Sequence, residues 1–150
     1  MSAVISPPGS GALASSGVRE PLVSVTLPVE RYISVARLVT AGVASRLDLP
    51  FDTVDDLQLA VELLVAASFA QGQQATVSFA GDASHLTISV SSLEAGVLDA
   101  TRAGFDSPAP VRLRDLLEKL VDSVGTSSVG TSAEPEPAIT LQKALEAPRQ

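Results

Sequence analysis

The sequence of 150 residues contains no cysteine, one histidine and only 3% aromatic residues. Without cysteine there can be no disulfide, no thiolate nucleophile and no zinc site built on thiolates. The lone histidine, His85, cannot form a metal cluster by itself. Because aromatic residues are rare, a hydrophobic core must be built from the Leu, Val, Ala and Ile that dominate a hydrophobic fraction of 45%.

Basic residues are also scarce, since 10 Lys and Arg stand against 17 Asp and Glu and give a net charge of -7. Such a chain lacks the clustered cations that neutralise nucleic-acid phosphates, and it is repelled by anionic lipid. No apolar run reaches membrane-spanning length, and the N-terminus lacks the apolar stretch of a secretory signal. We therefore expect a cytoplasmic protein that binds neither nucleic acid nor membrane.

Residues 1–20 are rich in Ser, Gly, Ala and Pro, which predicts a disordered tail ahead of a single domain over residues 21–146. Strands are predicted from the alternating segments LVSVTL, QATVSF and HLTISVS, from AITLQKAL and, weakly, from SVGTSSVGTS. Helices are predicted over residues 29–47, 52–69 and 111–124. This order indicates an α+β fold, a two-layer sandwich of a mixed, mostly antiparallel sheet with three helices on one face.

Several local features follow from the same patterns. The first helix is expected to bury Val35, Leu38, Val39 and Val43. Asp52 is the expected N-cap of the second helix. The segment LEAGVLDATRAGFDSPAP, residues 93–110, is expected to be a surface loop, and AEPEP a turn or linker. The third helix is expected to carry Arg114–Glu118 and Asp115–Lys119 pairs on its outer side.

Glu62 is the one acid in the apolar second half of the predicted helix FDTVDDLQLAVELLVAASFA. Helical spacing places it on one stripe with Gln58, Ala66 and Phe69. Burying a carboxylate is costly, so we expect this one to face a site or a pocket. The alternative is a structural carboxylate that is satisfied by Gln58 or by a nearby backbone N–H.

These segments resemble the anti-sigma-factor serine kinases of bacteria, members of the GHKL ATPase superfamily. The resemblance runs from LVSVTL through LQLAVE to HLTISVSS, and more faintly to ITLQKAL. The family helix reads D-x-x-L-A-V-x-E-x-x-x-N, which implies that Glu62 is the catalytic base. The Asn that holds the magnesium of ATP is replaced by Ala66, whose methyl group offers a hard cation no oxygen.

The other nucleotide motifs of that family are incomplete in this sequence. The pattern V-x-D-x-G-x-G falls on residues 90–96, where Ser92 replaces the Asp that reads adenine, Glu94 replaces a Gly, and Gly96 remains. The phosphate-binding G-x-G falls near residues 111–113 and lacks both glycines, although Arg112 could attract phosphate as a point charge. The resemblance thus implies Ser92, Gly96 and Arg112 as cofactor-binding residues only if nucleotide binds. We expect no cofactor and no metal.

A partner-binding surface is implied around Arg37, which follows Ala in A-R-L on the first predicted helix. In the resembled family an arginine at this place contacts a sigma factor or a STAS-domain antagonist. Ser34 and Ala41 lie on the same stripe and leave room for close approach. The alternative is a solvated arginine that pairs with Glu30 or Asp48.

The leading hypothesis is an anti-sigma-factor-like regulator that binds a sigma factor or a STAS-domain anti-anti-sigma protein, with lost or weak ATP binding. The alternative is an active serine/threonine kinase that uses ATP and magnesium to phosphorylate a STAS-domain partner. A third hypothesis is a dimerisation domain without a sigma partner. Homodimerisation is implied by the resemblance, and the sheet edge formed by LVSVTL is its candidate surface.

Overall fold

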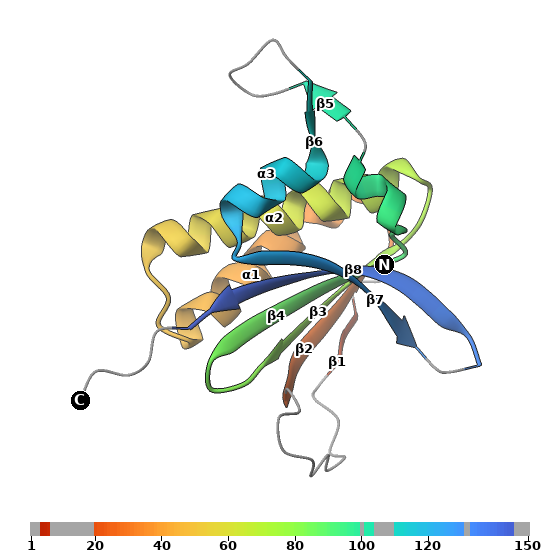
Figure 1. Ribbon diagram of the computed structural model, residues 1–150. Coiled ribbons are helices and arrows are strands. Elements are labelled where there is room, and N and C mark those ends of the chain that lie inside the picture. The colour runs from red at the N-terminus through yellow and green to blue at the C-terminus, as the bar shows by residue number, and fades with distance from the viewer. Residues whose placement is uncertain (1–3, 7–19, 100, 104–109, 131–132, 146–150) are drawn as a thin grey trace.

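The computed structural model describes residues 4–6, 20–99, 101–103, 110–130 and 133–145 (Figure 1). This part of the chain contains three α-helices and a six-stranded sheet, which confirms the α+β class. The helices are α1 (Ile33–Arg46), α2 (Phe51–Ala70) and α3 (Leu113–Leu120). The strands of the sheet are β1 (Val4–Ser6), β2 (Glu20–Leu27), β3 (Ala75–Gly81), β4 (His85–Ser91), β7 (Ser123–Gly130) and β8 (Pro135–Ala144).

The strand order in the sheet is β1-β2-β3-β4-β8-β7, and every pairing between these described strands is antiparallel. A separate pair of short strands, β5 (Thr101–Ala103) and β6 (Pro110–Arg112), projects beyond α3 (Figure 1). The 3-10 helices η1 (Glu30–Tyr32) and η2 (Ala95–Asp99) complete the elements. In Figure 1 the three α-helices lie on the same side of the sheet.

The two faces of the sheet differ in chemistry because neighbouring residues of a strand point to opposite sides. One row across four strands contains only buried aliphatic residues, namely Val25, Val77, Val90 and Ile139. The adjacent row contains only hydroxyl residues, namely Ser24, Ser78, Ser89 and Thr140. Side-chain hydrogen bonds join Ser24 to Ser78 at 3.2 Å and Ser89 to Thr140 at 3.4 Å. The apolar rows therefore belong to the core, and the hydroxyl rows form the other face.

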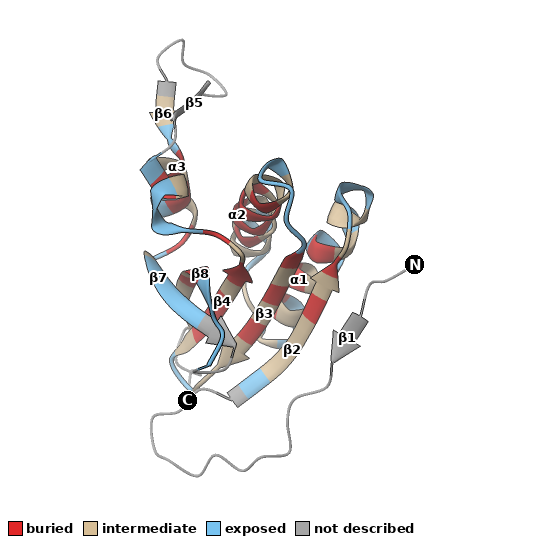
Figure 2. Cartoon of the chain, turned by 90° about the vertical axis from the view of Figure 1, so that its right-hand side faces the viewer, coloured by how far each residue is buried: buried red, intermediate tan, exposed pale blue. Residues whose placement is uncertain are grey.

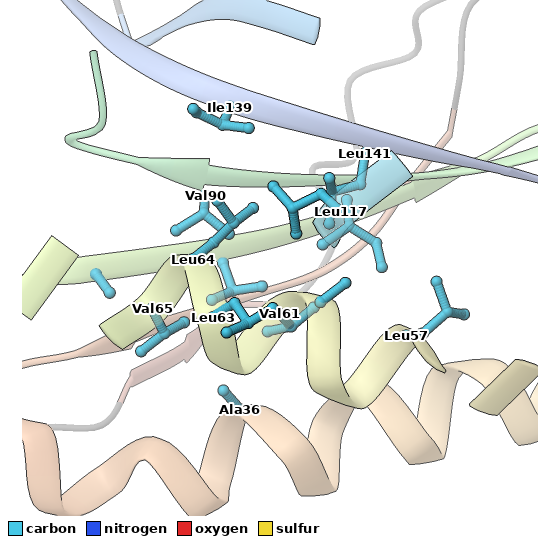
Figure 3. Packing of buried hydrophobic residues seen from close by; sticks show 14 of the residues in the cluster. Ala36, Leu57, Val61, Leu63, Leu64, Val65, Val90, Leu117, Ile139 and Leu141 are labelled. Atoms are coloured by element: carbon cyan, nitrogen blue, oxygen red, sulfur yellow. The ribbon is translucent and has the colours of Figure 1, made fainter. Parts of the chain in front are cut away.

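Helix α2 lies at the centre of the core, as Figures 2 and 3 show. Its residues Leu57, Val61 and Leu64 are fully buried, as the helical periodicity predicts. The helix begins at Phe51 directly after Pro50, and no side chain caps it. The expected N-cap at Asp52 is therefore wrong, because Asp52 lies in the first turn. An acid there still interacts favourably with the helix dipole.

Helix α1 buries its small residues most deeply, and the expected aliphatic stripe packs against the core only in part, through the half-buried Val35, Val39 and Val43. Its buried residues are Ala36, Thr40 and Ala44, and the Thr40 hydroxyl donates a hydrogen bond of 2.7 Å to the Ala36 carbonyl. Leu38, which was expected in the core, is 72% exposed. The expectation failed for Leu38 because α1 packs mainly against α2, which it approaches closely through short side chains, and Leu38 lies outside that contact.

Three other expectations also need correction. The segment AEPEP was expected to be a turn or linker, but only its first two residues precede β8, which begins at Pro135. Residues 93–110 are not simply a surface loop, because Leu93 and Leu98 are fully buried. The third helix ends at Leu120 and β7 begins at Ser123, so the predicted helix to residue 124 was too long.

The predicted tail and the predicted sheet edge are the other points of difference. Residues Val4–Ser6 pair with β2, and β2 itself begins at Glu20. Most of the remaining tail, residues 1–3 and 7–19, lies outside the described residues. Because β1 pairs with β2, LVSVTL is no free edge over the paired residues, and the edges of the described sheet are β1 and β7.

The turn between β3 and β4 is held by Asp82, whose side chain accepts hydrogen bonds from backbone and hydroxyl donors. Its Oδ1 atom receives the Ser84 N–H at 2.7 Å, the His85 N–H at 2.8 Å and the Ser84 hydroxyl at 3.0 Å. The backbone donor of Ser84, followed by that of His85, holds the pKa of Asp82 below its ordinary value. This geometry is an Asx turn, which explains why the chain reverses direction at GDAS between β3 and β4.

The turn predicts a pH dependence of stability. Because the pKa of Asp82 is lower in the folded state, its stabilisation is present above the unfolded pKa, about 3.9, and is lost as the pH falls through the folded pKa. Asp82→Asn keeps an acceptor oxygen but does not titrate. We expect the melting temperature of the wild type to exceed that of the variant at pH 6, with the gap narrowing below pH 4. A gap that stays constant down to pH 2 would contradict this assignment.

Candidate functional site

Two residues singled out for different roles, Arg37 and Glu62, lie together on the α1–α2 hairpin. The Arg37 Nε atom is 3.7 Å from the Glu62 Oε2 atom. The Gln58 Nε2 atom donates a hydrogen bond of 3.0 Å to the backbone carbonyl of Arg37, which ties the two helices at the same level. Gln58 therefore binds Arg37 and does not bind Glu62. In the described residues Arg37 pairs with Glu62, and not with Glu30 or Asp48.

The environment of Glu62 is less enclosed than the sequence suggested. Its side chain is 36% exposed, and that of Arg37 is 52% exposed. Glu62 is thus half-buried, because the stripe that contains it faces Arg37 of α1 and not the interior. A pair with this much solvent contact stabilises a fold by less than about 1 kcal/mol. Its effect is to hold the guanidinium in place at the surface.

The residues that the resemblance linked to nucleotide are engaged in local contacts. The Ser92 hydroxyl donates a hydrogen bond of 3.3 Å to the Glu136 Oε1 atom, and Ser92 adopts a left-handed backbone with a φ of 62°. The neighbouring Leu93 N–H donates to the Pro137 carbonyl at 3.3 Å. Ser92 thus anchors the start of the 93–110 segment to β8.

Gly96 lies in η2, where packing within the described chain does not require a glycine. A Cβ atom built at this position meets no other atom within 4 Å, and its φ is not in the left-handed region. The space beside Gly96 is therefore open. An approach of a ligand to this backbone is sterically free, but no contact in the chain itself explains the glycine.

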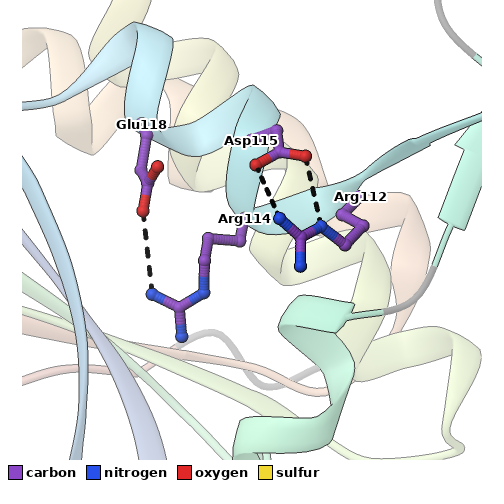
Figure 4. Close-up of polar contacts among 4 residues, drawn as sticks. All are labelled: Arg112, Arg114, Asp115 and Glu118. Atoms are coloured by element: carbon purple, nitrogen blue, oxygen red, sulfur yellow. Dashed lines mark hydrogen bonds and ion pairs between the residues drawn. The ribbon is translucent and has the colours of Figure 1, made fainter.

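Arg112 precedes α3 and forms a two-pronged pair with Asp115 (Figure 4). The Nε–Oδ2 distance is 3.2 Å and the Nη2–Oδ1 distance is 3.4 Å. The hydrogen bonds that Arg112 donates to this carboxylate, and then the charge of the carboxylate, raise the pKa of Arg112 above its ordinary value. The Arg114–Glu118 pair is present at 3.8 Å as expected. Because Asp115 already neutralises Arg112, this cation attracts phosphate less than its charge alone suggests.

The feature that the sequence did not reveal is exposed apolar surface on the two hairpin helices. Leu38 on α1 is 72% exposed and Phe51 at the start of α2 is 77% exposed. Ser34 is exposed as well, and Ala41 is half-buried. The position of Phe51 directly after Pro50 was an available signal, because the first residue of a helix often points away from the core. Leu38 gave no such signal, since it fits the aliphatic periodicity of α1.

Within the described residues, no group of three or more His, Asp or Glu side chains is arranged to hold a metal ion. None of the helices seen in the described ranges is both long and apolar enough to cross a membrane. No protein-family model matches the sequence, and a search among curated proteins finds no match.

Proposed function

We propose that this chain is a cytoplasmic regulator of the anti-sigma-factor type, which acts by binding a sigma factor or a STAS-domain anti-anti-sigma protein. The observation that carries this proposal is the exposure of Leu38 and Phe51 on the α1–α2 hairpin. A contiguous exposed apolar patch is typical of a surface that binds another protein, and Leu38 and Phe51 are the large apolar side chains that the two hairpin helices could contribute to one. The resemblance carried by LQLAVE and its flanking strands supplies the class of partner.

Arg37 and Leu38 are neighbours in the sequence and are both exposed on α1. Arginine and large apolar residues dominate the energetics of protein interfaces when they are surrounded by contacts that exclude water. Glu62 holds the Arg37 side chain at 3.7 Å, which reduces the conformational freedom that binding would remove. The partner therefore meets a positioned cation and an aliphatic anchor on the same helix.

Kinase activity is the weaker proposal, because each residue that the resemblance links to ATP argues against it. Glu62 faces a guanidinium, and Ala66 offers no oxygen one turn further along α2. Ser92 and Arg112 already have acidic partners in Glu136 and Asp115. A general base must reach the substrate hydroxyl, and Glu62 would first have to release Arg37.

Leu38→Ala tests the proposal with purified sigma factors and STAS-domain proteins of the same genome. We expect the affinity for the true partner to fall about tenfold or more, because the variant removes an anchor side chain. Isothermal titration calorimetry measures this change. Val29→Ala is the matched control, since Val29 is 44% exposed but lies outside the two helices. The affinity of this variant for the partner should equal that of the wild type.

Two results would overturn the proposal. Absence of binding to every sigma factor and STAS-domain protein tested would remove the partner class. Transfer of labelled phosphate from ATP and magnesium to a STAS-domain protein, abolished by Glu62→Ala, would replace the binding function with kinase activity. Equal affinities of Leu38→Ala and wild type would move the docking surface away from α1.

A further inference from the structure

Strand β7 is a long and uncharged edge of the sheet. It contains eight residues, Ser123–Gly130, and pairs only with β8 among the described strands (Figure 1). Its sequence, SVGTSSVG, contains no charged residue and no proline. Ser123 and the four residues from Gly125 to Ser128 are exposed, whereas Val124 is half-buried. The outward backbone N–H and C=O groups of β7 are thus available for pairing.

Natural sheets usually protect an edge of this length. Lysines, prolines, bulges and short strands prevent an edge from pairing with another chain. The opposite edge, β1, follows this rule with only three residues. The pairing of β7 with β8 runs without a register shift from the Ser123–Gln142 pair to the Gly130–Pro135 pair. No such protective device is present along β7.

We propose that β7 pairs antiparallel with β7 of a second copy of this chain, so that the two sheets become continuous across a two-fold axis. Under such an axis, residues that lie opposite each other must point to the same face of the sheet. The sequence numbers of two residues that lie opposite each other across the axis must then add up to an even number. The two central registers place either Thr126 opposite Thr126 or Ser127 opposite Ser127.

The charge distribution favours a second copy as the occupant. Two molecules that each carry a net charge of -7 repel each other, so they associate best where no like charges meet. The nearest acid in sequence is Asp122, whose carboxylate accepts the Ala144 N–H at 2.6 Å and the Lys143 ammonium at 3.4 Å. In an antiparallel pair the two Asp122 residues lie at opposite ends, roughly 27 Å apart, well beyond the screening distance of about 8 Å at physiological salt.

Single-cysteine variants test the pairing directly, because the chain has no cysteine of its own. Opposed residues in antiparallel strands have Cα atoms about 4.5–5.5 Å apart, which is within the reach of a disulfide. We expect Thr126→Cys or Ser127→Cys to give a cross-linked dimer under mild oxidation. Ser123→Cys is the matched exposed control, since its two copies would lie roughly 20 Å or more apart and should not cross-link.

Solution mass provides the second measurement. The wild type at about 100 μM should show twice the 15.4 kDa of one chain by light scattering. Thr126→Lys and Ser127→Lys, which place like charges across the axis, should shift the mass to that of one chain, whereas Thr126→Val should stay dimeric. Far-ultraviolet circular dichroism confirms that each variant is folded.

Three results would overturn the pairing: a monomeric wild type, dimers that persist in both lysine variants, or cross-linking at Thr126 and Ser127 no greater than at Ser123. The pairing does not depend on the sigma-factor proposal, because its readout is the mass of the purified chain alone. A failure at β7 would leave the α1–α2 docking surface untouched, and the reverse also holds.

Discussion

Replacement of Leu64 by alanine is expected to lower the free energy of unfolding by about 3–4 kcal/mol. Leu64 lies on the sheet-facing side of α2 and is fully buried, close to Val90 of β4 (Figure 3). The substitution removes three carbon atoms from a packed interior, and the resulting cavity adds to the loss of transfer free energy. Because few aromatic side chains are available to move into the gap, the site has little means to collapse.

Leu38→Ala is the matched control for this experiment, since it makes the same chemical change at a position that is 72% exposed. Urea unfolding should give a stability within about 0.5 kcal/mol of the wild type for this variant. The contrast separates core packing on α2 from the docking surface on α1. Equal losses at the two positions would mean that Leu38 is covered in solution, which would also contradict its use as a partner anchor.

The strands with clear alternation could be predicted from the sequence alone. HLTISVS matches β4 over all seven residues, because a period of two and the turn at GDAS fix both its register and its start. The interior of α2 could be predicted for a similar reason. Its apolar run leaves no polar face from Leu57 onward except near Glu62, and such a helix must be buried.

Helix α1 shows that hydrophobic periodicity alone does not predict which residues of a helix are buried. Its sequence carries an aliphatic stripe and a small-residue stripe, and either could face the interior. The small residues Ala36, Thr40 and Ala44 are fully buried because α1 packs against another helix, the valines of the aliphatic stripe are half-buried, and Leu38 is left in solvent. Which residues of α1 become buried depends on the shape of α2, its partner in the hairpin. The local sequence pattern of α1 therefore does not determine it.

The prediction of where β8 begins was wrong for a different reason. Two prolines in AEPEP argue against a strand, because proline cannot donate to the hydrogen-bond ladder. In the structure, β8 pairs with β4 only from Ala138 onward, while Pro135 and Pro137 pair with β7 alone. These prolines thus occupy the part of β8 that is locally an edge, where a missing N–H is tolerated.

Of the candidate site, the residues could be chosen from the sequence but their pairing could not. Glu62 and Arg37 were assigned separate roles, yet their side chains meet at 3.7 Å across the hairpin. The 24 residues between Arg37 and Glu62 hide this contact, because it depends on how α1 and α2 align after the turn. Gln58 was considered as a partner of Glu62, whereas its Nε2 atom donates a hydrogen bond to the Arg37 carbonyl.

The hydroxyl face of the sheet contains one side chain that stands apart from its neighbours. Thr87 of β4 is only 5% exposed, and its Oγ1 atom has no hydrogen-bond partner in the described ranges. Other hydroxyls nearby are paired, such as Ser127 with Thr140 at 2.7 Å. A buried hydroxyl without a partner loses its hydrogen bonds to water on folding and costs about 1–3 kcal/mol. The Thr87 hydroxyl is therefore the group on this face whose removal we expect to stabilise the fold.

Thr87→Val is accordingly expected to raise the free energy of unfolding by about 1–2 kcal/mol, because valine keeps the shape and the strand preference and removes the unsatisfied group. Thr40→Val is the matched control, since the Thr40 hydroxyl is equally buried but donates to the Ala36 carbonyl at 2.7 Å. That variant should show no gain, because its hydroxyl is already satisfied. Urea unfolding of both variants measures the difference in sign. A loss of stability in Thr87→Val would mean that the hydroxyl binds water or another group in solution, and that the outer face of the sheet is wetter at β4 than its burial indicates.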